Sequence, residues 1–147
     1  GAAGTTWAGR VLLADYQYTT GGGQSSHTHR LTVCLIRDPS LELPHFVVRP
    51  ERAVLDRIIE FLGARDLDFE DDPTFSQAYV VQGEDEAAVR GLLTPSVRAL
   101  LVQLVEERVN LEGRGDTLLL HRGRLVDPER AGELLQLLHQ LVPMLRR

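Results

Sequence analysis

The chain has 147 residues, 43% hydrophobic and 25% charged, with a formal net charge of −5. This length is enough for one self-sufficient core, and the composition excludes general disorder and collagen-like or purely coiled-coil chains. Every basic residue other than histidine is arginine, and the absence of lysine excludes chemistry that needs a Schiff-base or P-loop lysine. The single cysteine, Cys34, excludes an intramolecular disulfide.

The sequence contains no apolar run close to the roughly 18 residues that a membrane span needs. Its arginines are scattered among acidic residues rather than clustered, so we expect no nucleic-acid binding. Residues 1–9 are mostly small and lack the features of a signal peptide. We predict that residues 1–9 are a linker or cloning remnant and that residues 10–147 form a single domain.

The first part of the domain is predicted to form three strands. Arg10–Thr20 is rich in aromatic and β-branched residues with an alternating pattern, and Thr28–Arg37 is apolar on both faces. The glycine- and serine-rich segment Gly21–Ser26 between them favours a hairpin loop. A short third strand is predicted at Leu43–Val48.

Helical and extended patterns alternate through the middle of the chain. Pro50 is predicted to open a helix that continues to Leu62, because its apolar residues recur on one stripe. An acid-rich loop at Asp66–Pro73 is then followed by a predicted strand at Phe75–Gln82. The acidic turn at Gly83–Glu86 indicates the start of a short helix that ends near Gly91.

The last third of the domain begins with the clearest amphipathic helix, which Thr94 caps and Pro95 opens and which continues to Val105. Strands are predicted at about 108–112 and 117–122, joined by a tight turn. A final helix is predicted to begin at Asp127–Glu129. The order βββα-βααββα predicts an α+β fold, a two-layer sandwich of a mostly antiparallel sheet and about four helices. We expect the leucine-lined helix faces to cover one sheet face, with the ionisable residues outside.

His27 and His29 are candidate metal ligands, because side chains at i and i+2 of a strand point to the same side. A third ligand would come from His45, His121 or an acidic residue. The alternative is that the end of the loop carries two exposed histidines, and this interpretation is favoured. The sequence predicts no cofactor.

Five carboxylates lie in the acid-rich segment, at Asp66, Asp68, Glu70, Asp71 and Asp72, and are candidates for binding a hard cation. The segment lacks the glycine of an EF-hand loop. Leu67 and Phe69 alternate with the acids, which favours an edge segment with its apolar side inward.

Four arginines flank predicted strand ends and helix starts: Arg49, Arg52, Arg122 and Arg124. They are candidates for a surface that binds an anionic ligand or partner. Ordinary salt bridges on an acidic surface are the favoured alternative.

For nucleophilic catalysis the sequence offers no Gly-x-Ser-x-Gly motif, and Cys34 is predicted to be a buried small hydrophobe.

Three segments, Asp15–Gly21, Leu43–Glu51 and Phe75–Asp85, resemble a bacterial domain family of unknown function. In that family the domain commonly lies outside the membrane in proteins with a short transmembrane segment upstream. The resemblance implies an extramembrane domain whose membrane attachment depends on a segment absent from this sequence, and it implies no reaction.

The sequence therefore predicts a non-catalytic domain that acts in protein–protein or membrane-proximal interaction, with self-association as a compatible possibility. The alternative is a small-ligand or metal-dependent enzyme that uses His27, His29 and nearby acids. A converging set of histidines in a polar pocket would favour the enzyme, whereas separated histidines and an exposed apolar surface would favour the binding domain.

Overall fold

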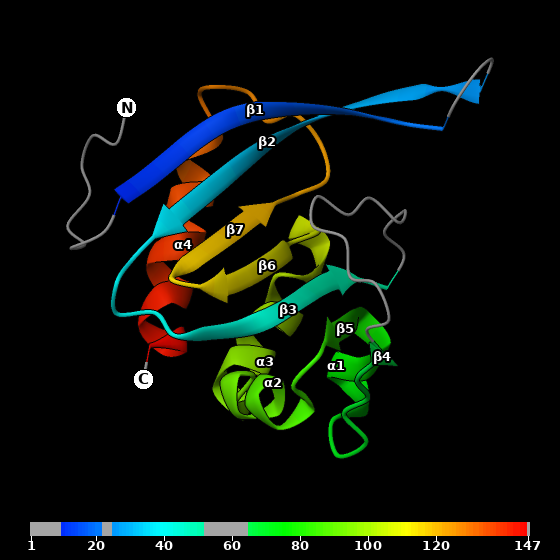
Figure 1. Ribbon diagram of the computed structural model, residues 1–147, viewed down its shortest axis with the longest axis vertical. Coiled ribbons are helices and arrows are strands. Elements are labelled where there is room, and N and C mark those ends of the chain that lie inside the picture. The colour runs from blue at the N-terminus through cyan, green and yellow to red at the C-terminus, as the bar shows by residue number, and fades with distance from the viewer. Residues whose placement is uncertain (1–9, 22–24, 52–64, 147) are drawn as a thin grey trace.

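The computed structural model describes residues 10–21, 25–51 and 65–146 and contains a sheet with helices packed against it (Figure 1). The sheet has seven strands in the order β1-β2-β7-β6-β3-β5-β4, and every neighbouring pair is antiparallel. The strands are β1 (Arg10–Thr20), β2 (His27–Arg37), β3 (Leu43–Pro50), β4 (Arg65–Asp66), β5 (Tyr79–Gly83), β6 (Asn110–Gly115) and β7 (Thr117–His121).

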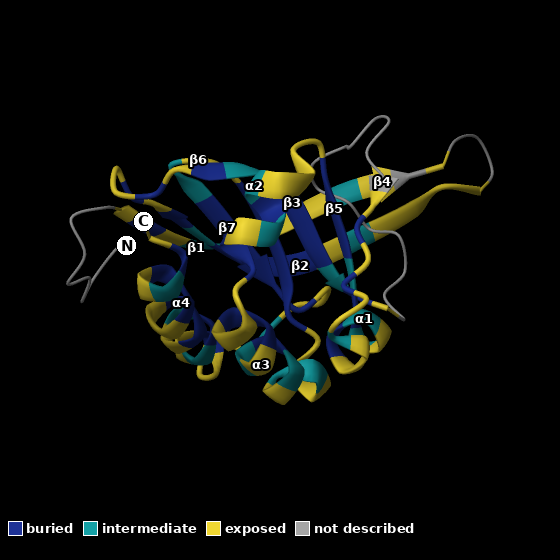
Figure 2. Ribbon diagram, turned by 90° about the horizontal axis from the view of Figure 1, so that it is seen from below, coloured by how far each residue is buried: buried dark blue, intermediate teal, exposed yellow. Residues whose placement is uncertain are grey.

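The described residues also form four α-helices and a short 3₁₀ helix: α1 (Pro73–Ala78), α2 (Glu86–Leu92), α3 (Pro95–Gln103), η2 (Val105–Glu107) and α4 (Ala131–Leu145). Figure 2 shows α1, α3 and α4 on the same side of the sheet. Helix α2 packs against β3, and α4 packs against β2 and β7. The predicted α+β two-layer sandwich with an antiparallel sheet is confirmed.

The main core lies between the sheet and the helices. Leu101 of α3 and Leu138 of α4 have no exposed surface, which confirms the predicted apolar stripes of both helices. Helix α3 begins where predicted, because the Thr94 hydroxyl accepts a hydrogen bond from the Val97 amide and Pro95 occupies the first turn.

Two predictions for the middle of the chain differ from the structure. Pro50 is the last residue of β3 rather than the first residue of a helix, and most of that predicted helix falls in residues 52–64, outside the described residues. The strand predicted from Phe75 is wrong in its first half, which forms α1 before β5 begins at Tyr79. Asp72 caps α1 by accepting a hydrogen bond from the Phe75 amide, and Pro73 follows it in the first turn.

The C-terminal elements keep their predicted type but shift their ends. Strand β6 continues to Gly115, so the connection to β7 is shorter than the predicted turn. Helix α4 begins at Ala131, because the Asp127–Arg130 segment forms a turn in which the Arg130 amide donates to the Asp127 carbonyl. The predicted linker, residues 1–9, lies outside the described residues.

The prediction that ionisable side chains stay outside is wrong at several positions. Asp38, Glu112, His121 and Arg122 are all at least 95% buried. A buried charge is tolerated when it has charged or hydrogen-bonding partners. The Arg122 guanidinium lies 2.7 Å from the carboxylate of Glu107 and 3.4 Å from that of Glu133, so it joins η2 to α4.

Candidate functional site

The two candidate metal ligands lie near the far end of the β1–β2 hairpin. His27 is exposed, while His29 is half-buried and stacks on Tyr18 with ring centroids 4.8 Å apart. In the strand register, His121 lies opposite Val33 of β2. Val33 is four residues along β2 from His29, a distance of about 13 Å. His121 accepts a hydrogen bond from the Gly123 amide, and His45 lies on β3, three strands away from β2. The structure therefore does not bring these histidines together.

The candidate arginines are also separated. Strand alternation and register put Arg49 on the sheet face away from core residue Val48, whereas Arg122 points toward η2 and α4. Arg124 is exposed, and its carbonyl accepts a hydrogen bond from the Thr32 amide. Arg52 lies outside the described residues. The described arginines form no common anion site.

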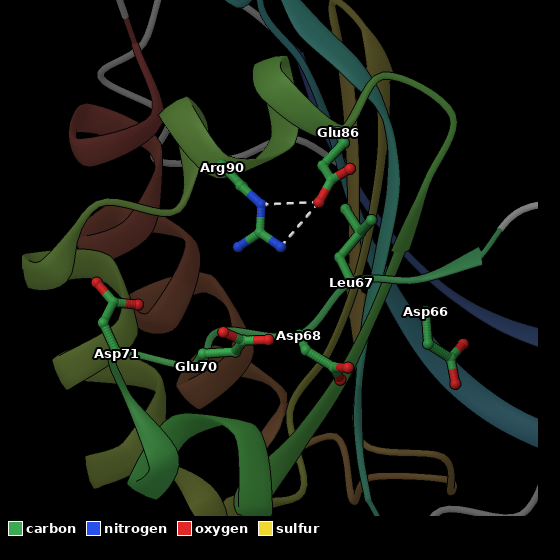
Figure 3. A pocket seen from close by; sticks show the side chains of 7 residues that line it. All are labelled: Asp66, Leu67, Asp68, Glu70, Asp71, Glu86 and Arg90. Carbon is green, nitrogen blue, oxygen red and sulfur yellow. Dashed lines mark hydrogen bonds and ion pairs between the residues drawn. The ribbon is translucent and has the colours of Figure 1, made fainter.

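The acid-rich segment borders an open pocket of about 560 Å³, lined by Asp66, Leu67, Asp68, Glu70, Asp71, Glu86 and Arg90. Figure 3 shows its carboxylates spread around the rim, with Arg90 bonded to Glu86 at 2.9 Å. Leu67 and Phe69 are buried, as the alternating pattern predicts. The fifth acid of the segment, Asp72, is 2.9 Å from Arg98 and does not line the pocket.

Contacts to the ring of Phe69 hold the acid-rich segment in place. The guanidinium groups of Arg90 and Arg98 each lie 5.0 Å from the centre of its ring, and Phe75 meets it edge-on at 5.2 Å. Arg90 and Arg98 also each pair with a carboxylate. The two cations therefore contribute to the packing of the acid-rich segment around Phe69. Within residues 10–21, 25–51 and 65–146, no group of three or more His, Cys, Asp or Glu side chains is arranged to hold a metal ion.

Cys34, the remaining nucleophile considered from the sequence, has no exposed surface. Burial raises the pKa of its thiol from 9.0 to about 12. The thiol is therefore protonated at neutral pH and packed in the core, as predicted.

A row of buried polar residues crosses the central strands on the face away from the main core. In the strand register, Asn110 of β6 lies opposite His121 of β7. Glu112 of β6 lies between Val47 of β3 and Leu119 of β7. These residues alternate with core residues Leu111 and Leu120. The alternation of polar and apolar residues in β6 identifies which side chains point to this second face of the sheet. A sequence pattern alone does not show that the face is buried.

Among the residues that the structure describes, the β1–β2 hairpin carries two of the three exposed large hydrophobic side chains. Leu12 and Tyr16 of β1 are 54% and 39% exposed, and the described part of the chain has one other exposed large hydrophobic residue, Leu125. Because Leu12 and Tyr16 are four residues apart in a strand, both side chains point to the same face. We call this side of β1 the hairpin surface; it consists of Arg10, Leu12, Ala14, Tyr16 and Tyr18.

The hairpin extends past the rest of the sheet (Figure 1). Strand β7 pairs with β2 only from Val33 to Arg37, while β1 pairs with β2 over its whole length. The far half, Tyr16–Thr20 and His27–Leu31, therefore has no further strand beside it among the described residues. Sequence reasoning identified the hairpin but not which of its residues remain exposed.

No helix in the described residues is both long and apolar enough to cross a membrane. Comparison of the chain with protein-family models, curated proteins and solved structures finds no match. The resemblance to a bacterial extramembrane domain thus stays a prediction.

Proposed function

We propose that this chain is a non-catalytic domain that binds a protein through the hairpin surface and the outer edge of β1. The observation that carries the proposal is an 11-residue strand that lies at the edge of the sheet formed by the described residues and exposes Leu12 and Tyr16 on one face. An exposed edge strand offers backbone N–H and C=O groups to an incoming strand, and adjacent side chains select the partner.

The two strands of the hairpin are paired along the whole of β1, which supports its role in presenting this surface. Its register is continuous from the Arg10–Arg37 pair to the Thr20–His27 pair. Thr32 donates to Asp15 at 2.9 Å, and Arg30 donates to Gln17 at 3.1 Å, so side chains of the two strands are also connected. A preordered strand loses less conformational entropy when a partner binds.

The membrane-proximal version of this role is a further expectation from the family resemblance. In either setting the binding residues are the same. The proposal therefore concerns the protein partner, and attachment to a membrane is a separate question.

The proposal is tested by photocrosslinking in an extract of the source organism. A photoreactive side chain at position 16 is expected to capture a specific protein, which is then purified and titrated with the wild-type chain. Leu12→Glu is expected to weaken this direct binding at least about tenfold, because it places a charge in the apolar contact. Equal binding of the wild type and Leu12→Glu contradicts the proposal.

Leu125→Glu is the matched control. Leu125 is 48% exposed and lies in the segment whose Arg124 and Val126 backbone groups bond to Thr32 of β2. It is thus close to the hairpin but on the other side of β2 from β1. Binding is expected to survive this substitution.

A further inference from the structure

We infer that the partner of β1 is β1 of a second copy of this chain, paired antiparallel around a two-fold axis through Ala14. This inference rests on the proposed role of the hairpin surface in protein binding. It assigns the occupant of the edge and the register of the contact.

The edge lacks the features that usually prevent strand pairing. Natural edge strands are often short, interrupted by proline or a bulge, or lined with lysine. Strand β1 has 11 residues, contains no proline, glycine or lysine, and pairs with β2 without a bulge. Its one central charge, Asp15, accepts a hydrogen bond from Thr32 of its own hairpin. The backbone edge is therefore long and regular.

The side chains of β1 complement one another in this register. An axis through Ala14 places Leu12 opposite the partner's Tyr16, and Tyr16 opposite the partner's Leu12. Both residues are among the most exposed apolar side chains described, and the contact covers each of them. Arg10 then lies opposite the partner's Tyr18, where a guanidinium and an aromatic ring attract each other. Aromatic and aliphatic side chains directly opposite each other stabilise antiparallel strands.

Neighbouring registers are less favourable. Moving the axis to Asp15 places this carboxylate opposite the partner's Asp15, and like charges directly opposite destabilise a strand pair. Moving it to Leu13 places Leu12 opposite the partner's Ala14 and shortens the paired segment. A two-fold pair through Ala14 also closes on itself, so the edges of both copies are satisfied without forming a filament.

The first test measures association and backbone protection together. Sedimentation velocity from low micromolar to several hundred micromolar protein is combined with hydrogen exchange of the β1 amides. We expect a reversible dimer, with slower exchange of the outward-facing β1 amides as the dimer forms. A dimer without this protection uses another surface and overturns the inference.

The same experiment separates the inference from the proposed function. A monomer whose alternate β1 amides exchange rapidly has an open edge, which overturns self-pairing but leaves the edge free for another protein. A monomer whose β1 amides are all protected has this edge covered within one chain, which overturns both the inference and the proposed function.

A charge test checks the register. In Leu12→Glu/Tyr16→Glu, the Ala14 axis places two pairs of like charges opposite each other, so the dimer is expected to weaken at least about tenfold. In Leu12→Glu/Tyr16→Arg, the same axis pairs opposite charges, and dimerisation is expected to exceed that of the double-glutamate variant. The substitutions at Leu12 and Tyr16 replace exposed side chains, so we expect the fold to be retained. Equal association of the two variants overturns the Ala14 register, and Leu125→Glu serves as the control.

Discussion

Asp38 is a buried carboxylate that connects the segment after β2 to the end of α4. It accepts hydrogen bonds from the Ser40 amide and hydroxyl at 2.9 and 2.7 Å and from Arg146 at 2.8 Å. Burial alone would raise the pKa of Asp38, but the hydrogen bonds from Ser40 and Arg146 outweigh this effect and hold its pKa below the ordinary value. The ionised carboxylate therefore stabilises the native state.

This carboxylate predicts a specific pH dependence. The unfolded chain takes up the proton first as the pH falls through the ordinary Asp range near about 4, so the stabilisation is present above that range and lost below it. We expect Asp38→Asn to lower the free energy of unfolding by about 1–3 kcal/mol at neutral pH. The difference from the wild type is expected to shrink toward about pH 3, as measured by urea unfolding at several pH values.

Glu42→Gln is the control for this experiment because it neutralises an exposed carboxylate four residues away. It is expected to leave stability nearly unchanged at neutral pH. A gap between Asp38→Asn and the wild type that is the same at every pH would contradict the assigned role of the Asp38 charge.

Single residues also show where sequence reasoning stops. Asp38-Pro39-Ser40 is recognisable as the end of a strand, but Arg146 is 108 positions away and its pairing with Asp38 depends on the tertiary fold. His27 and His29 share a face as strand periodicity requires, whereas the separation of His121 from them follows from the β2–β7 register. Neither long-range relation is present in local patterns.

At the scale of an element, Asp72 has two roles in α1. Its carboxylate caps the helix through the Phe75 amide at 3.2 Å and pairs with the largely buried Arg98 at 2.9 Å. We expect Asp72→Ala to lower the free energy of unfolding by about 1–3 kcal/mol, since it removes the cap and one partner of Arg98. Thermal or urea unfolding measures the change.

Asp71→Ala is the matched control, because Asp71 is the preceding carboxylate of the same segment and is exposed. It is expected to change stability by no more than about 0.5 kcal/mol. Similar losses in the two variants would show that the acid-rich segment contributes through its total charge rather than through the contacts of Asp72.

Substitution by alanine is expected to have opposite effects on stability at two glycines. Gly132 lies in the first turn of α4 and a Cβ there would meet no other atom within 4 Å, so Gly132→Ala is expected to stabilise the protein by about 0.5–1 kcal/mol. A Cβ at Gly113 in β6 would overlap the buried ring of Phe46, so Gly113→Ala is expected to destabilise it by about 1–3 kcal/mol. Chemical denaturation measures the free energy of unfolding of both variants. If the two substitutions changed this free energy equally, the packing of β6 on β3 at Phe46 would be contradicted.

The elements also differ in how clearly the sequence identifies them. Thr94-Pro95 predicts the start of α3 correctly, and the same kind of signal, Asp72-Pro73, precedes α1. The aromatic and β-branched residues of Phe75–Gln82 favour a strand throughout, and this preference is realised only from Tyr79. In α1, the cap and the packing of Phe75 against Phe69 outweigh local strand propensity.

At the scale of the whole molecule, one main cluster of buried side chains joins β1 to α4. We therefore expect a single cooperative unfolding transition, with far-UV and near-UV circular dichroism changing together. Leu101→Ala and Leu138→Ala, at fully buried positions in two helices, are each expected to cost about 2–5 kcal/mol and to shift both signals equally.

Leu125→Ala is the control for these two variants, because Leu125 is 48% exposed. Its effect is expected to be small. If Leu101→Ala shifted one spectroscopic signal without the other, α3 would unfold independently of the sheet and the cluster would not act as one core.

The fold class was predictable because periodicity identified most elements and their order favoured an antiparallel sheet. The neighbours of each strand were not predictable in the same way. β2 and β3 follow each other in sequence, yet β7 and β6 lie between them in the sheet. Helix caps and apolar stripes act over a few residues, whereas this arrangement is determined by contacts across most of the chain.

This strand order has a consequence for how the protein is made on the ribosome. β2 and β3 emerge early, but the β6–β7 hairpin that fills the space between them is translated more than 60 residues after β3 begins. Until then both nascent strands have open sides in what becomes the middle of the sheet, and long-range closure of this kind slows folding. Completion of the native sheet therefore has to wait for β6 and β7, and until then the unpaired strands are surfaces that chaperones can protect.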